Sequence, residues 1–381
     1  MEKNRTSQLQ FLRFAAISLI YAWHATNKSI DCFAHGYMAR WNGANSAVVF
    51  FIMLSGLLTG YYLCDRKTDD GGGAGGLSTV WTYMKGKLLK FYPLYLAVTL
   101  LSVMFSDLPK LITARDFAGA RPLIFSLARH LLLVQAWYKT DPFDCFAFSE
   151  VGWFLSVIMS LYLLSIPLRK AALKIMASCE RESAKLSVRN AFLLVIAASL
   201  ILLVIYCLLL RNADTEFWEY AFPPARVFEY IAGMSLGVVL GTVRDAGQDA
   251  QGTQSEVREK RPSMLYTVLE IASPLLWIVF LFLPLPDWGF RIVNWLIPVV
   301  FTLVVYTPGR GYISALFRMR PFVYLGRISF AFYLIHSMIL NAWKAGVTPE
   351  ALETVLGCAF AFAICFVVSV LAASILTRRP G

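Results

Sequence analysis

The chain is built from apolar blocks that are each long enough to cross a lipid bilayer. Of its 381 residues, 58% are hydrophobic and only 15% are charged, against roughly 25% charged residues in an average soluble domain. The blocks are about 17 to 25 residues long, which is the length needed to span a hydrocarbon layer of about 30 Å. The sequence therefore predicts an all-α, polytopic membrane bundle. We expect it to form a single membrane-embedded domain over residues 1–381, with no soluble extracytoplasmic domain.

The charges between the blocks decide how many of them cross the membrane. The blocks cover residues 9–27, 46–64, 89–106, 123–137, 152–168, 191–210, 226–243, 265–284, 291–307, 322–343 and 352–376. Block 123–137 is short and carries Arg129 and His130 at its centre, where a charge costs about 2.5 to 3.5 kcal/mol. If this block does not cross, the inner segments hold about twice as many Lys and Arg as the outer ones, and if it crosses the excess inverts. We therefore predict about ten transmembrane helices, both termini in the cytoplasm, and a re-entrant or interfacial segment at 123–137.

The net charge of +11 would suggest nucleic acid in a soluble protein, but here the basic residues cluster in short loops between the blocks. We expect them to contact membrane lipids and not nucleic acid. The seven cysteines are scattered and form no metal-ligand spacing. We expect no metal site.

Ionisable residues inside apolar blocks are expensive unless they face the bundle interior or water, and Arg13, His24 and His336 are the ones that suggest a function. Arg13 and His24 are eleven residues apart in the first block, which places them on nearly the same helical face and roughly 16 Å apart along the axis. His336 lies at a similar depth in the block 322–343. A neutral imidazole titrates near pH 6.5 and can accept a proton from a hydroxyl. The two histidines thus either line a shared catalytic cavity or have separate roles. In the second case His24, beside Trp23, belongs to an interfacial aromatic belt.

Two further patterns have both a functional and a structural interpretation. Lys87 and Lys90 precede the block 89–106 at spacing i, i+3, which suits either phosphate binding by one helical face or anchoring at the membrane boundary. In the second block, Ser55 offers a hydroxyl and Gly56 a close approach of helix backbones. Neither pattern decides its role alone.

Taken in order, these motifs resemble the acyltransferase type 3 family of membrane O-acylases. The resemblance rests on five elements: Arg13 to His24, Phe50-Phe51 to Ser55-Gly56, Lys87 and Lys90 before Pro93, Trp153-Phe154-Leu155, and Gly326 through Ser329 and Tyr333 to His336. They extend over nearly the whole chain, and the tryptophan element is typical of a Trp-Phe-Leu variant branch.

The chain departs from the family pattern at two places. The basic pair is usually arginine, whereas lysine keeps the charge but loses bidentate phosphate contacts. The family's frequent glutamate after the tryptophan motif is absent, because Ile158 stands near that place. Glu229, in the block 226–243, is the substitute that we expect as an acidic partner for the histidine.

The resemblance implies an O-acetyltransferase of the bacterial inner membrane that moves an acyl group, expected to be acetyl, from cytoplasmic acetyl-CoA to a glycan or lipid-linked sugar. It implies His24 as general base or acyl carrier, with Arg13 and His336 as further catalytic residues. Donor binding is expected from Lys87, Lys90 and Arg13, and the residues Ser55, Trp153 and Tyr333 are expected to line the cavity. No permanently bound cofactor is expected, and polysaccharide biosynthesis proteins are the expected partners. A proton-coupled transporter or glycan-lipid flippase is the rival class, and an inactive relative acting as an assembly partner is a third.

Overall fold

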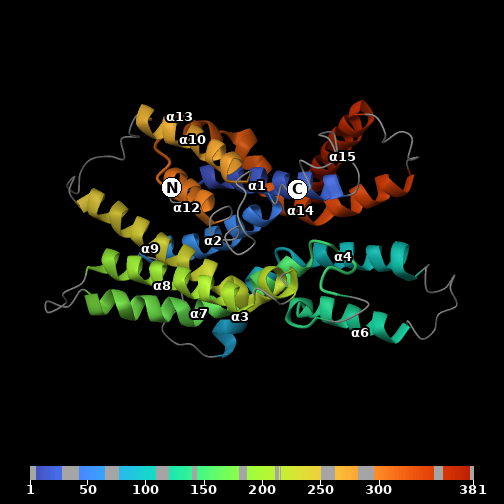
Figure 1. Ribbon diagram of the computed structural model, residues 1–381, viewed down its shortest axis with the longest axis horizontal. Helices are drawn as coiled ribbons and strands as arrows, with labels where there is room; N and C mark the ends of the chain where they lie inside the picture. The colour runs from blue at the N-terminus through green and yellow to red at the C-terminus, as the bar shows by residue number, and fades with distance from the viewer. Residues whose placement is uncertain are drawn as a thin grey trace. The chain divides into compact units, whose positions relative to one another are not determined.

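The computed structural model describes eleven stretches of the chain: residues 6–27, 43–64, 77–108, 120–139, 144–179, 187–210, 214, 216–249, 262–281, 296–346 and 355–377. These residues are mostly helical, and among them there is no strand (Figure 1). The prediction of an all-α protein is confirmed.

All ten blocks that were predicted to cross the membrane contain helix. The helices are α1 (Gln8–Asn27), α2 (Gly43–Leu63), α4 (Tyr92–Ser102), α7 (Trp153–Cys179), α8 (Val188–Leu209), α9 (Val227–Asp249), α10 (Met264–Leu281), α12 (Ile297–Tyr306), α14 (Arg320–Gly346) and α15 (Val355–Leu376). The other helical elements are α3 (Leu77–Leu88), η3 (Val103–Asp107), α6 (Ala120–Leu131), η4 (Gln135–Trp137), η5 (Glu216–Ala221), η6 (Pro223–Arg226) and α13 (Tyr312–Phe317).

Six helices of the described residues are long and apolar enough to cross a membrane. They cover Ala44–Leu63, Trp153–Cys179, Val188–Leu209, Pro223–Asp245, Arg320–Lys344 and Gly357–Leu376. A seventh is added if α3 and α4, which are separated by a short break, count as one span. Helix α1 is twenty residues long but is too polar to count, and α10 and α12 are shorter apolar helices. The protein is thus a multi-pass membrane protein.

The segment predicted not to cross forms the short helix α6 and the turn η4. A helix of twelve residues is about 18 Å long, well short of the hydrocarbon thickness. Its outer face is apolar, with Ile124 and Phe125 68% and 61% exposed, whereas Ser126, Arg129 and His130 are buried. Because the polar side chains point inward, the exposed face of α6 suits contact with lipid.

The helices gather into two compact units that are interleaved in the sequence. Unit 1 comprises Met1–Gln8, Val48–Gly86 and Ile158–Arg318, and unit 2 comprises Leu9–Ala47, Lys87–Val157 and Met319–Gly381.

In unit 1, glycines let α2 and α9 pack backbone against backbone. A Cβ atom at Gly56 or Gly60 of α2 would collide with the carbonyl oxygen of Tyr230 or Met234. A Cβ atom at Gly237 of α9 would in turn collide with the carbonyl oxygen of Leu57. Small residues at four-residue spacing are typical of closely packed membrane helices. The structural interpretation of Gly56 is therefore correct.

Unit 1 also buries charged side chains that contact partners within the same unit. The carboxylate of Glu270 on α10 accepts hydrogen bonds from the backbone N–H of Gly311 (3.1 Å) and Ser314 (3.1 Å) and from the Ser314 hydroxyl. Arg226 donates from Nη1 to both carboxylate oxygens of Glu229, at 3.0 and 3.1 Å. Both members of the second pair have no exposed side-chain surface. These contacts tie α10 to α13 and η6 to α9.

The core of unit 2 is a cluster of aromatic rings between α1, α14 and α15. Tyr21 of α1 lies 5.8 Å from Phe332 and 5.2 Å from Phe366, measured between ring centroids, and its hydroxyl donates to the carbonyl of Phe362 at 2.6 Å. Gly326 of α14 leaves no room for a Cβ atom against the backbone of α1. Close packing of these three helices brings the ends of α1 and α14 together.

Candidate active site

Two histidines from opposite ends of the sequence meet inside unit 2. His24, in the last turn of α1, and His336, in the middle of α14, lie 5.2 Å apart between ring centroids. His336 has no exposed surface and His24 is 9% exposed. The structure therefore brings together the two residues that were predicted at a similar depth.

A carboxylate completes this cluster. Glu150, which directly follows the buried Ser149 and precedes the start of α7 at Trp153, places Oε2 at 3.2 Å from Nδ1 of His24. Its side chain is 37% exposed and that of His24 is 11% exposed. Sequence reasoning missed Glu150 because it searched for acidic residues inside the apolar blocks. A signal was present, since Glu150 stands three residues before the tryptophan motif.

The neighbours of Nδ1 indicate which ring nitrogen of each histidine carries the proton. Nδ1 of His336 lies 3.2 Å from the carbonyl oxygen of Phe332, which can only accept, so Nδ1 is the protonated atom. Nε2 of His336 is then a lone-pair acceptor, and it is buried with no hydrogen-bond partner. His24 likewise turns Nδ1 to a carboxylate. In both rings Nε2 is left as the basic atom.

The motif around Tyr333 and Trp153 joins α14 to the segment that carries Glu150. The hydroxyl of Tyr333 donates to the carbonyl of Val151 at 2.9 Å. Trp153 is buried at the start of α7 and packs 6.0 Å from Phe146 between ring centroids. Both predicted residues thus lie in the framework that holds the cluster.

A second support was not predicted from the sequence. The amide of Gln135 donates to the carbonyl of Gly152 at 3.0 Å and to the hydroxyl of Tyr95 at 3.3 Å. That hydroxyl donates in turn to the carbonyl of His130 at 3.0 Å. Gln135 is fully buried. Its hydrogen bonds therefore hold the non-helical segment before α7 in the interior.

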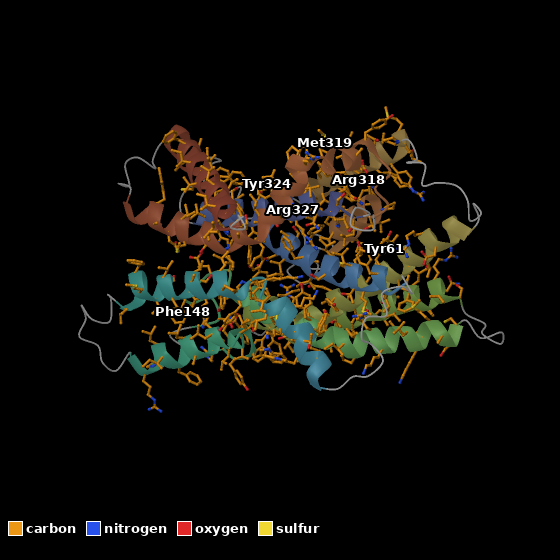
Figure 2. All side chains as sticks on the ribbon, turned by 180° about the vertical axis from the view of Figure 1, so that it is seen from behind. Tyr61, Phe148, Arg318, Met319, Tyr324 and Arg327 are labelled. Carbon is orange, nitrogen blue, oxygen red and sulfur yellow. The ribbon has the colours of Figure 1, made fainter. Side chains whose placement is uncertain are left out.

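The His130 imidazole belongs to this supporting structure. Its Nδ1 lies 2.8 Å from the carbonyl of Ser126, and its ring meets that of Phe148 edge to face at 4.8 Å. Figure 2 labels Phe148 in the segment between η4 and α7. Burial lowers the pKa of His130 to about 4 from its ordinary value of 6.5. The ring is therefore neutral at physiological pH.

The remaining predicted residues lie apart from the histidine pair or in the other unit. Arg13 precedes His24 by three turns of α1, and its Nη1 donates to Gln10 at 3.3 Å. Lys87 lies in the last turn of α3, and Lys90 lies in the turn before α4. Their spacing predicted that the two lysines share one helical face. In the structure they do not lie on one continuous helix. Ser55 lies on α2 in unit 1.

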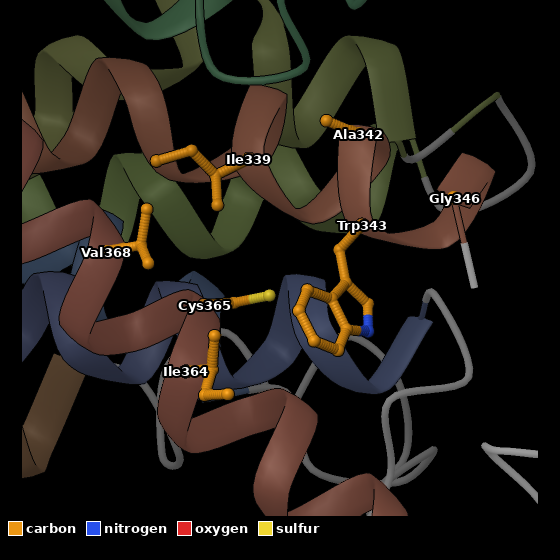
Figure 3. A pocket seen from close by; sticks show the side chains of 7 residues that line it. All are labelled: Ile339, Ala342, Trp343, Gly346, Ile364, Cys365 and Val368. Atoms are coloured by element: carbon orange, nitrogen blue, oxygen red, sulfur yellow. The ribbon is translucent and has the colours of Figure 1, made fainter.

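A groove of about 490 Å³ runs between α14 and α15 of unit 2 (Figure 3). Its lining is apolar: Ile339, Ala342, Trp343, Gly346, Ile364, Cys365 and Val368. Both helices can cross a membrane, so the groove suits lipid chains. It offers no cationic side chain for a phosphate group.

The family model for an acyltransferase domain of type 3 matches residues 7–373, from before α1 to near the end of α15. The chain belongs to this acyltransferase family. The resemblance of its motifs is thereby confirmed, and the protein is a membrane acyltransferase. No curated protein and no solved structure matches the chain significantly.

Proposed function

We propose that this acyltransferase moves an acetyl group from acetyl-CoA to a hydroxyl of a glycan or lipid-linked sugar. The observation that carries the proposal is the pair of buried imidazoles with a carboxylate on one of them, in a chain of this family. A base with its lone pair on Nε2 is what a sugar hydroxyl needs in order to attack a thioester.

In the proposed step, the hydroxyl oxygen attacks the thioester carbonyl carbon while its proton passes to Nε2 of His24. The C–O bond forms, the C–S bond breaks, and the CoA thiolate takes the proton back from the imidazolium. A covalent acyl-histidine at His24 is the alternative route, with the hydroxyl attacking in a second step. His336, Trp153 and Tyr333 line the reaction cavity.

Donor binding is assigned to the basic residues near the start of α4. The phosphates of CoA are met by Lys87 and Lys90 as point charges, with Arg13 adding positive charge along α1. The donor side is the cytoplasm of a bacterial cell, where both termini lie, and the acceptor side is the outer face of the inner membrane. Polysaccharide biosynthesis proteins supply the acceptor.

The test uses membranes of the native cells, with the chromosomal copy replaced by wild type or by His24→Ala. After incubation with acetyl-CoA labelled in the acetyl group, wild type transfers label to the envelope glycan. The transfer rate of the variant is expected to be at least about 100-fold lower. Equal label in the two membranes contradicts the proposal. Uptake or flipping of a glycan-lipid that survives His24→Ala, without acyl transfer, identifies a carrier instead.

A second arm tests the phosphate site. CoA binding to wild type is expected to weaken as salt is added, because the contacts are between charges that solvent and ions can reach. In Lys87→Ala/Lys90→Ala the salt dependence is expected to disappear and the KM for acetyl-CoA to rise about tenfold, with kcat unchanged. Salt-sensitive binding that persists in the double variant removes the lysines from the donor site.

A further inference from the structure

The carboxylate beside His24 comes from a position that the order of the motifs does not predict. The family's frequent glutamate after the tryptophan motif is replaced here, with Ile158 near its position, whereas Glu150 precedes the motif by three residues. Glu229, the substitute expected from the sequence, is paired with Arg226 in unit 1. Glu150 is the residue whose carboxylate contacts His24.

We infer that Glu150 is the positioning residue of the site, holding His24 in the tautomer and orientation that leave Nε2 as the base. The inference rests on the proposed function and deepens it. A carboxylate accepts hydrogen bonds only, so Oε2 at 3.2 Å from Nδ1 favours the tautomer with the proton on Nδ1. When Nε2 takes the proton of the acceptor hydroxyl, the resulting imidazolium faces a negative charge.

The segment that carries Glu150 is held at the two residues that follow it. Tyr333 of α14 binds the carbonyl of Val151, and Gln135 binds the carbonyl of Gly152. The same segment includes Phe148 in the left-handed backbone region, at φ 60°, which costs a non-glycine residue on the order of 1 kcal/mol. A strained backbone fixed by two buried hydrogen bonds keeps the Glu150 carboxylate at a defined place.

The surroundings of His24 give Glu150 a role that no other described charge fills. The titratable group that faces His24 from α14 is His336, which is buried and holds its Nδ1 on the carbonyl of Phe332. A proton on His336 would lie buried beside His24, whereas a proton on His24 is paired with Glu150. Within this cluster the carboxylate of Glu150 therefore faces His24 and not His336.

The experiment measures acetyl transfer from labelled acetyl-CoA to the envelope glycan in the same native-cell membranes, as a function of pH. In Glu150→Gln we expect kcat to fall about 10-fold to 100-fold, while the KM for acetyl-CoA stays within about twofold. The acid limb of the pH–rate profile moves to lower pH, because an amide lacks the negative charge that faces the imidazolium. Glu150→Asp keeps the charge and recovers part of kcat.

Asp144→Asn is the matched control, because it removes one negative charge from the same segment. Asp144 accepts a hydrogen bond from the backbone N–H of Phe146 at 2.8 Å, and an asparagine oxygen can keep this bond. We expect wild-type kcat and an unchanged pH profile for this variant. Thermal aggregation of Glu150→Gln is expected to follow that of wild type, since its side chain is partly exposed.

The outcomes separate the two levels of the account. If His24→Gln abolishes transfer but Glu150→Gln keeps the wild-type kcat and pH profile, the inference on Glu150 is overturned and the proposed function stands. An equal loss in Glu150→Gln and Glu150→Asp, with earlier thermal aggregation and no change in profile, assigns Glu150 a structural role and also overturns it. If His24→Gln transfers label as wild type does, both proposals fail.

Discussion

The charged clusters of the two units differ in their exposure. In unit 1, Glu270 is enclosed by backbone N–H groups and a hydroxyl, and Arg226 and Glu229 neutralise each other with no exposed surface. In unit 2, the His24 side chain keeps 11% exposure beside a carboxylate that is 37% exposed, and His336 buries an Nε2 without a partner.

This difference separates structure from chemistry. The paired charges of unit 1 have no exposed surface, whereas the carboxylate beside His24 is partly exposed. The closed clusters of unit 1 hold helices together, and we propose that the open cluster of unit 2 serves a substrate. Changes in unit 1 should lower stability at constant activity per folded molecule, and changes in unit 2 should do the reverse.

The largest effect is expected where helix backbones touch in unit 1. Gly237→Leu places a side chain against the carbonyl of Leu57 on α2. The two backbones are already in contact, so this side chain fits only if the helices separate. We expect loss of monodisperse protein in size-exclusion chromatography after detergent extraction. Gly86→Leu, where a Cβ atom meets nothing within 4 Å, is the control and should elute as wild type does.

Next in size is the buried ion pair. Arg226→Met strands the Glu229 carboxylate in the interior, and breaking such a pair costs about 3 to 5 kcal/mol. The midpoint of thermal unfolding should fall, and the double variant Arg226→Met/Glu229→Leu should recover most of it. If the single variant is as stable as wild type but inactive, the pair belongs to the chemistry and the comparison between the units is broken.

In unit 2, His336→Phe tests whether the unpartnered nitrogen serves the reaction. The phenyl ring can keep the stacked contact with Phe332, now 5.8 Å between centroids, while Nε2 is removed. Acetyl transfer should fall about 100-fold, and thermal stability should stay the same or rise. Wild-type transfer rates in this variant would assign His336 to packing.

The smallest effect concerns acid stability. Because burial lowers the pKa of His130 to about 4, its contribution is fully present above about pH 6.5 and is lost as the pH falls towards 4. The thermal midpoint of wild type should drop over this range, and that of His130→Phe should drop less. Parallel curves for the two proteins would show that His130 does not set acid stability.

The sequence allowed the helical class, the motif residues and the meeting of His24 with His336 to be predicted, because apolar length and depth along a helix are local properties. Glu150 was not predictable in this way, since it lies in a non-helical segment whose path depends on Tyr333 and Gln135. The break at Lys90 was also missed. The spacing of Lys87 and Lys90 fits a helix and a turn equally, and the chain forms the turn.

The central claim is that the open cluster of unit 2 is the catalytic centre of this acyltransferase. The most direct measurement is the rate of acetyl transfer from labelled acetyl-CoA to the envelope glycan per folded molecule of His24→Gln, with folded protein quantified by its thermal transition. The account predicts a loss of at least about 100-fold with an unchanged transition. A rate within about twofold of wild type, at the same amount of folded protein, would contradict it.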